Sequence, residues 1–225
     1  MAKKPGDPSL RSTQLLGRYA EGQVSGTVDL GFGPKATTYG VQLTLDHLDA
    51  ATALKVTPRN GSIRGTMRGD LFMLGELGQK YARRGGGSFQ IDGAEALKVP
   101  LMAKIHETVN KEPPNLASFH NITVEFLVEK HRVTLQQLEL TGPGLSMLGT
   151  GTLNLSNDRI GLNLIAAAPK SLNGVPLLQD LVQGTGGEIL QLDVRGSVNQ
   201  PTITAQPLKN VSEAFQTFIK GRDLK

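Results

Sequence analysis

Apolar and polar residues alternate with a period of two along most of this chain. In each such stretch, aliphatic side chains occupy every second position and polar ones lie between them, which is typical of strands with one buried and one solvated face. The alternation predicts strands at 24–30, 41–45, 63–67, 89–91, 122–128, 133–140, 145–155, 160–166, 190–198 and 203–205. Because short polar turns join most of these segments, the sequence predicts an antiparallel sheet of about ten strands.

One predicted strand changes phase within its own length. Val133 and Leu135 hold the apolar places at odd positions, whereas Leu138 and Leu140 hold them at even positions. An extra residue in a strand shifts the phase in this way, so the sequence predicts a β-bulge or local twist between Leu135 and Leu138.

Four segments depart from the alternation and carry helical spacing. The first places leucines three residues apart and ends before the glycines at 85–87, and the second opens with Pro100 as a first-turn proline. The predicted helices span 71–83, 99–111, 175–184 and 208–220, the last with an amphipathic face.

The predicted elements group into one β-rich unit. Residues 1–20 are predicted to be a disordered or linking segment (1–14 disordered), 21–207 the sheet domain, and 208–225 a C-terminal amphipathic helix. The stretch at Pro113 and Pro114 is the best candidate for a break between two halves of the sheet. The predicted fold class is therefore mainly β with a few short helices (β+α).

Composition excludes several classes of function. The 225 residues include no Cys, which rules out disulfides, cysteine-based zinc or iron–sulfur sites and a thiol nucleophile. The net charge of +4 is scattered rather than clustered, and there is no Trp, so nucleic-acid binding is not expected. The chain shows neither an apolar run near the ~20 residues of a membrane-spanning helix nor a signal peptide.

A search for catalytic chemistry finds no constellation. His47, His106, His120 and His131 lie in different predicted elements, and none has the spacing of a metal site. The glycine-rich segments complete neither a Rossmann fingerprint nor a phosphate loop, and the carboxylates are spread singly over the polar faces. The sequence therefore predicts a protein that is not an enzyme and uses no cofactor and no metal.

What remains is the aliphatic face of the predicted sheet, for which two interpretations stay open. It could be an ordinary sheet face covered by helices, or the inner face of a curled sheet that accepts acyl chains, with glycines where the sheet bends. The candidate lining residues share the apolar phase of their strands: Ile122, Val124, Phe126, Val128, Leu145, Met147, Leu153, Leu155, Ile160, Leu162, Leu164, Leu190, Leu192 and Val194.

An ordered series of short motifs resembles a known family. The series reads GSIRG at 61–65, GGSFQIDGAE at 86–95, VPL at 99–101, SF at 118–119, ITVEF at 122–126, VTLQQLEL at 133–140, LGTGTLNL at 148–155 and LDVRGSVNQPTI at 192–203. In order and spacing, residues 22–205 resemble the carboxy-terminal region of AsmA-like proteins, a family that includes the TamB- and YhdP-type proteins.

The resemblance implies an elongated, taco-like β-sheet with a hydrophobic groove. It also implies a non-enzymatic role in the periplasm or cell envelope, where such proteins carry phospholipid toward the outer membrane or support outer-membrane biogenesis. Phospholipid is then the expected partner, with selectivity set by groove width, and no cofactor is expected.

Family members usually begin with an inner-membrane helix and a long amino-terminal region, neither of which occurs in this sequence. We therefore expect either the carboxy-terminal part of a longer protein or a short divergent member that works with a partner. Other envelope proteins, or a missing N-terminal part of the same protein, are further expected partners. The alternative function is a structural or assembly module that pairs through its sheet edges with a larger envelope protein.

Overall fold

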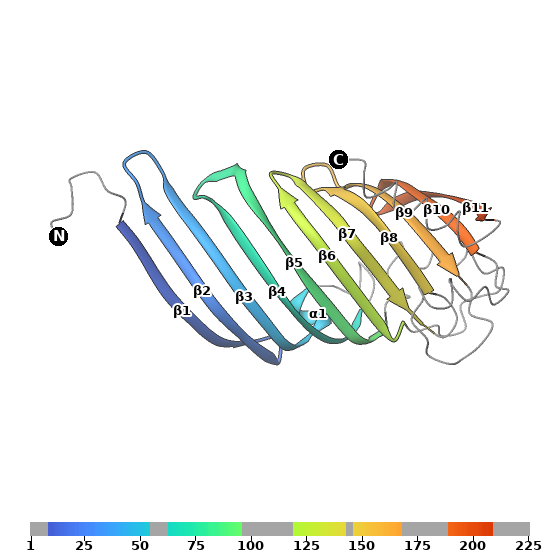
Figure 1. The fold of residues 1–225 in the computed structure, drawn as a ribbon, viewed down its shortest axis with the longest axis horizontal. Helices are drawn as coiled ribbons and strands as arrows, with labels where there is room; N and C mark the ends of the chain where they lie inside the picture. Colours follow the sequence, from blue (N-terminus) through green and yellow to red (C-terminus); the bar gives the residue numbers. More distant parts are fainter. Residues whose placement is uncertain (1–8, 55–62, 96–118, 143–145, 168–188, 209–225) are drawn as a thin grey trace.

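The protein is built around one large antiparallel sheet. The structure is a computed structural model that describes residues 9–54, 63–95, 119–142, 146–167 and 189–208. In these segments eleven strands lie side by side in chain order, from β1 at one edge to β11 at the other (Figure 1). The prediction of a mainly β, antiparallel fold is confirmed.

The strands are β1 (Ser9–Tyr19), β2 (Gly22–Phe32), β3 (Thr37–Asp49), β4 (Arg64–Glu76), β5 (Gln79–Glu95), β6 (Asn121–Glu129), β7 (Arg132–Thr141), β8 (Ser146–Asn154), β9 (Arg159–Ala167), β10 (Ile189–Ser197) and β11 (Gln200–Leu208). The described helix α1 (Ala50–Ala53) is a single turn that follows β3. Asp49 caps it, because its carboxylate accepts a hydrogen bond of 2.8 Å from the backbone N–H of Thr52.

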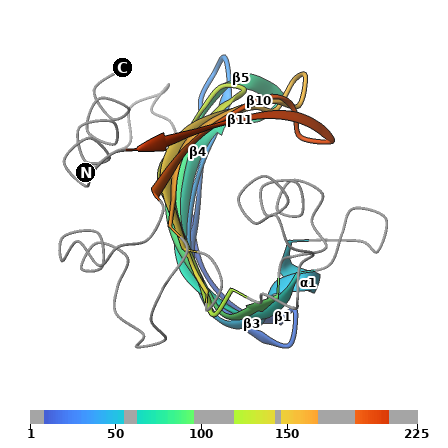
Figure 2. The same ribbon diagram turned by 90° about the vertical axis from the view of Figure 1, so that its right-hand side faces the viewer.

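The sheet is open and strongly curled. Viewed from its β11 end, it has a C-shaped cross-section, and α1 lies inside the curl (Figure 2). Ala50 of α1 and Leu48 just before it belong to the same apolar cluster as the aliphatic sheet residues. The aliphatic face is therefore the inner face, which we call the concave face, and the polar side chains point mainly to the outer, convex face.

Strand register aligns the aliphatic residues into rows that cross the whole sheet. Residues directly opposite each other in an antiparallel pair point to the same face, so the register assigns each side chain to one face. One row, which we call the central row, consists of Leu15, Gly26, Leu43, Leu71, Gly87, Phe126, Leu135, Gly151, Leu162, Val194 and Ile203. The next consists of Gly17, Val24, Leu45, Gly69, Phe89, Val124, Leu138, Gly149, Leu164, Leu192 and Ala205.

Glycines in these rows sit where neighbouring backbones crowd the concave face. A Cβ on Gly69 would lie 2.2 Å from the backbone oxygen of Ser88, and one on Gly149 would lie 2.4 Å from that of Asn163. No larger residue fits there without moving the strand beside it. These glycines thus permit the close approach of strands on the inside of the curl.

The predicted irregularity in the second half is confirmed. The register between β7 and β8 shifts between Leu135 and Leu138, where the alternation changes phase. A second irregularity, at His47, was not predicted; this residue has a φ of 55° and lies where the β3–β4 register shifts between Leu45 and Leu48. The shift keeps Leu48 on the aliphatic face, opposite Met67.

The predicted helix at 71–83 is wrong, because this segment forms the end of β4 and the start of β5. Leu71 and Leu74, which helical spacing would place on one side, point to opposite faces of β4. Pairing on both flanks outweighs the weak helical signal, since Leu71 lies opposite both Leu43 and Gly87. Gly78, with a φ of 82°, makes the turn between the two strands.

The amino-terminal expectation also differs from the structure, which places residues 9–19 in strand β1. Leu15 and Leu16 are adjacent in this segment, so it lacks the alternation that identifies the other strands. Its pairing with β2 is nevertheless continuous over eleven residue pairs. The predicted helices at 99–111, 175–184 and 208–220 lie outside the described residues, and the remaining domain boundaries stay predictions.

Candidate functional site

The concave face gathers nearly all of the candidate lining residues. The register places Ile122, Val124, Phe126, Val128, Met147, Leu153, Ile160, Leu162, Leu164, Leu190, Leu192 and Val194 on it. Leu155 is the exception, because it follows the end of β8 and is exposed in a turn. Leu145 lies outside the described residues.

Exposure of this face changes from one end of the sheet to the other. In the central row, Leu162 and Val194 are almost completely buried, whereas Leu43 and Leu71 are only half-buried and Leu15 is 39% exposed. The central row is therefore more accessible over β1–β4 than over β9 and β10, on the same face but towards the opposite end of the sheet from most of the predicted residues.

Sequence reasoning left the residues of β1–β4 off the candidate list. The alternation at Leu43 and Leu45 was visible in the sequence, but nothing distinguished these positions from core positions elsewhere. Leu71 was assigned to a helix and Leu15 to a disordered segment, so neither could be joined to the same face. The structure brings all four together through the β1–β4 register.

Charged groups lie away from the central row and its neighbour, which contain only aliphatic residues, glycine and two phenylalanines. On the convex face Arg68 pairs with Asp92, and the hydroxyl of Thr44 donates a hydrogen bond of 2.6 Å to Asp70. These two rows offer van der Waals contact and dehydration, whereas the polar pairs named here lie on the convex face.

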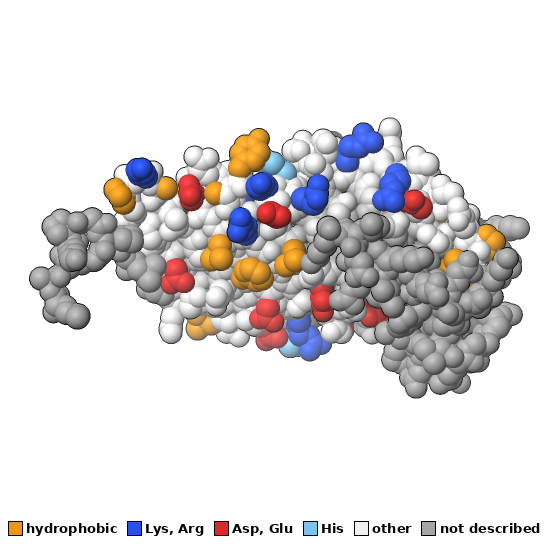
Figure 3. Space-filling model, turned by 45° about the horizontal axis from the view of Figure 1, so that its top comes forward, with side chains coloured by type: hydrophobic (Ala, Val, Ile, Leu, Met, Phe, Trp, Pro, Cys, Tyr) orange, Lys and Arg blue, Asp and Glu red, His pale blue; other side chains and the backbone are white. Residues whose placement is uncertain are grey.

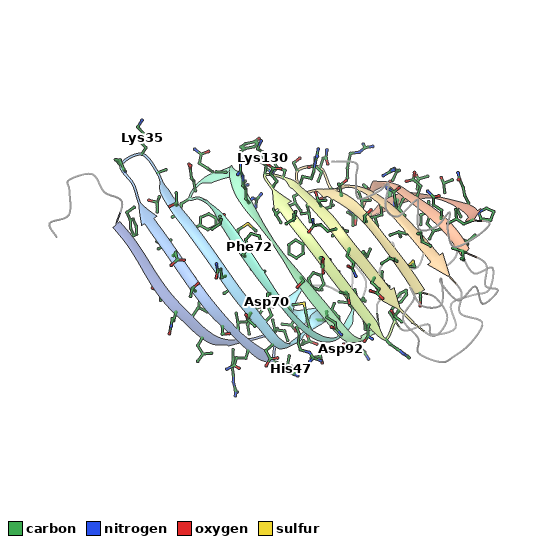
Figure 4. All side chains as sticks on the ribbon, in the orientation of Figure 1. Lys35, His47, Asp70, Phe72, Asp92 and Lys130 are labelled. Carbon is green, nitrogen blue, oxygen red and sulfur yellow. The ribbon has the colours of Figure 1, made fainter. Side chains whose placement is uncertain are left out.

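The convex face carries a shallow depression that the sequence did not predict. It has a volume of about 630 Å³ and crosses β2–β6, with Asp70, Phe72 and Leu127 among its lining residues. Figure 3 looks onto this face and shows apolar side chains near its middle with charged ones around them, and Figure 4 shows Phe72 and Asp70 on β4. A Cβ added at Gly86 would approach the side chains of both Phe72 and Leu127, so this glycine leaves room for both.

The described titratable residues form no metal-binding group of three or more. His47 lies 2.6 Å from the carboxylate of Asp46, both on the surface, and His131 packs edge-on against the ring of Tyr81. His106 lies outside the described residues. No described helix is long and apolar enough to cross a membrane.

Comparison of the chain with protein-family models, with curated proteins and with solved structures gives no match.

Proposed function

We propose that this chain binds phospholipid acyl chains on its concave face, as a non-enzymatic, AsmA-like module of the periplasm or cell envelope. In this role it conducts lipid between membranes or supports outer-membrane biogenesis. The observation that carries the proposal is the continuity of the aliphatic rows along the inside of a curled, open sheet. The resemblance of residues 22–205 to AsmA-like proteins supplies the ligand class and the compartment.

The chemistry of the concave face suits a hydrocarbon chain. An acyl chain has no hydrogen-bonding groups, so it gains free energy by leaving water, at about 0.8 kcal/mol for each CH₂ buried. Aliphatic and glycine positions meet this requirement, and the two aromatic rings of these rows, Phe89 and Phe126, pack against each other. Groove width, rather than polar contacts, would then decide which lipid is accepted.

Access favours the β1–β4 end as the place where lipid first makes contact. Leu43, Leu45 and Leu71 keep part of their surface exposed there, whereas Leu162 and Leu192 are almost fully excluded from solvent. The exposed leucines offer apolar area that a ligand could cover without opening the packed part of the sheet.

The experiment compares two adjacent residues that point to opposite faces of β3. The full chain is purified, extracted with organic solvent, and the extract analysed for phospholipid by mass spectrometry. Leu43→Asp places a carboxylate on the half-buried concave surface, so we expect it to lose at least about tenfold of the bound lipid while the fold is kept. Gln42→Asp, on the convex face, should bind lipid like the wild type.

Two results would overturn this proposal. One is the absence of phospholipid from the extract of the wild-type chain, together with no binding of a fluorescent phospholipid added to it. The other is a Leu43→Asp variant that is folded by circular dichroism and carries as much lipid as the Gln42→Asp variant.

The alternative, an assembly module that pairs through its sheet edges with a larger envelope protein, is favoured by one observation. The edge strand β1 is eleven residues long and pairs without interruption on its inner side. The lipid analysis separates the two candidates, because an assembly module would carry no phospholipid and would be indifferent to Leu43→Asp.

A further inference from the structure

The two edges of the sheet differ in how well they are protected against further pairing. An edge strand presents a row of unpaired N–H and C=O groups that another strand can bind, and natural proteins usually block such a row with proline, charge or a bulge. β1 forms one edge and β11 the other. Their sequences are SLRSTQLLGRY in β1 and QPTITAQPL in β11.

The β11 edge is blocked by proline. A proline in a paired edge strand occupies a position whose nitrogen faces away from the neighbouring strand, because it has no N–H to contribute to the ladder. Pro201 and Pro207 are six residues apart, so both face the same free side. Of the outward positions 201, 203, 205 and 207, two therefore lack a donor.

The β1 edge has no such block. Ala20 and Glu21, with φ of 50° and 66°, form a two-residue turn between Tyr19 and its partner Gly22. The residues that flank such a turn exchange hydrogen bonds, so odd-numbered residues of β1 bond to β2. The N–H groups of Gln14, Leu16 and Arg18 therefore point to the free side, and β1 contains no proline and no register shift.

Apolar side chains on β1 are unusually exposed for an edge. Leu16 is 75% exposed, and Leu15 and Tyr19 also keep a large part of their surface in water. All described side chains from Thr13 to Tyr19 are exposed, and Arg18 is the one charged residue among them. The charged residues of β1 are Arg11 and Arg18, and between them the edge presents apolar surface that a second strand would cover.

We propose that β1 pairs antiparallel with β1 of a second copy of this chain, in a register centred on Leu15. This register places Gln14 opposite Leu16 and Ser12 opposite Arg18, all with outward N–H and C=O groups, and it brings no like charges face to face. Leu15 then lies opposite Leu15 of the second copy, on the concave face of both. The central row becomes continuous across the two copies.

The geometry of this pairing limits the assembly to two copies. A two-fold axis through Leu15 uses the same edge of both copies, so the interface is isologous and ends at a dimer. The remaining free edges are the two proline-blocked β11 strands, which disfavours growth into a longer sheet. A second copy accounts for both the open edge and the blocked one.

Because the chain has no Cys, single cysteine substitutions test this register directly. In the proposed dimer the two Leu15 positions form a non-hydrogen-bonded pair with Cα atoms about 4.5 Å apart, which lies within the range of a disulfide. Leu15→Cys should therefore convert most of the protein to a disulfide dimer of twice the 24.0 kDa chain mass under mild oxidation.

Two matched controls distinguish this pairing from random collision. Thr13→Cys lies on the same face of the same strand, but the two copies of residue 13 would be about 13 Å apart and beyond disulfide reach. Ile203→Cys lies at the opposite end of the central row, on the β11 edge. Both variants should remain reduced monomers on denaturing gels under the same conditions.

A second variant tests the backbone pairing without a disulfide. Leu16→Pro removes an N–H that points to the free side, as Pro201 and Pro207 do on β11, and leaves the ladder with β2 intact. Light scattering should show a concentration-dependent dimer for the wild type. The dimer's Kd should rise at least about tenfold in Leu16→Pro, because each copy loses a hydrogen bond.

The proposal is overturned if the wild type stays monomeric by light scattering up to about 100 µM, because even a weak dimer with a Kd of that order would be partly formed at this concentration. It is also overturned if Thr13→Cys or Ile203→Cys cross-links as readily as Leu15→Cys. These results are independent of lipid, so failure here leaves the proposed acyl-chain binding to be judged by its own extraction experiment.

Discussion

The β1–β4 end and the β6–β10 end of this sheet are built alike but are packed differently. Leu43 and Leu71 lie in the same register row as Leu162 and Val194, on the same concave face and with the same aliphatic chemistry. At the first end these side chains are half-buried, and at the second they are almost fully buried. The difference shows that a period-two pattern assigns a residue to a face but leaves open whether that face is accessible.

The two edges extend the same contrast. β11 carries two prolines that remove outward donors, while β1 carries none and exposes Leu16. The accessible aliphatic surface and the unprotected edge therefore lie at the same end of the sheet, and a strand added to β1 would lengthen the exposed part of the concave face.

The largest expected effect comes from placing a carboxylate in the buried part of the central row and, for comparison, in its accessible part. Leu162 is 1% exposed, so Leu162→Asp buries an unpaired charge and should lower the free energy of unfolding by about 3 kcal/mol or more. Leu43→Asp keeps water contact and should cost about 1 kcal/mol. Urea denaturation followed by circular dichroism measures both, and equal losses would contradict the difference between the two ends.

A smaller effect is expected from adding a methyl group along one row. A Cβ on Gly69 would lie 2.2 Å from the backbone oxygen of Ser88, so Gly69→Ala should destabilise by about 1–3 kcal/mol. Gly17 lies in the same row at the β1 edge, and a Cβ there meets nothing within 4 Å. Gly17→Ala should therefore be neutral or slightly stabilising in the same unfolding assay.

The smallest effect concerns the cap of α1, inside the curl near the accessible end. Hydrogen bonds from the side chain and backbone of Thr52 lower the pKa of the Asp49 carboxyl. Because this pKa is lowered, the ionised cap stabilises the folded state at pH values above about 3.9, the pKa of an Asp carboxyl in the unfolded chain. This contribution to stability is lost as the pH falls through the pKa that Asp49 has in the folded state. Asp49→Ala should cost about 0.5–1 kcal/mol at pH 7.

The control for this cap is Asp49→Asn, which keeps an acceptor for Thr52 but does not titrate. Unfolding measured between pH 7 and pH 3 should show a steeper loss of stability for the wild type than for this variant. If the two pH profiles coincide, the carboxylate contributes nothing through its charge.

The sequence predicted the strands best where alternation is long and unbroken. Segments 122–128 and 160–166 are strands as expected, and the phase change at Leu135 and Leu138 is a register shift in the structure. The prediction failed at 71–83, where leucines three residues apart fit a helix as well as a strand. It also failed at β1, where adjacent leucines hide the alternation and the pairing with β2 supplies the stabilisation.

The residues of the candidate site were also predicted in part and missed in part. From the sequence we predicted that Ile122, Val124, Leu162 and Val194 share one apolar face, and the register agrees. The sequence did not identify Leu43, Leu71 and Leu15 as the exposed part of that face. Exposure depends on how the folded sheet is packed, which the alternation along a single strand does not report.

The sequence by itself determined the face of most apolar residues, the antiparallel order of consecutive strands and the position of one bulge, because alternation and short turns are local properties of the chain. Only the tertiary structure decided that α1 lies inside the curl of the sheet, that the leucines of β1–β4 remain accessible, and that β1 is an unblocked edge. These properties depend on register and packing between strands far apart in the sequence. A leucine can therefore belong to the buried core in one part of a row and to the accessible surface in another part of the same row.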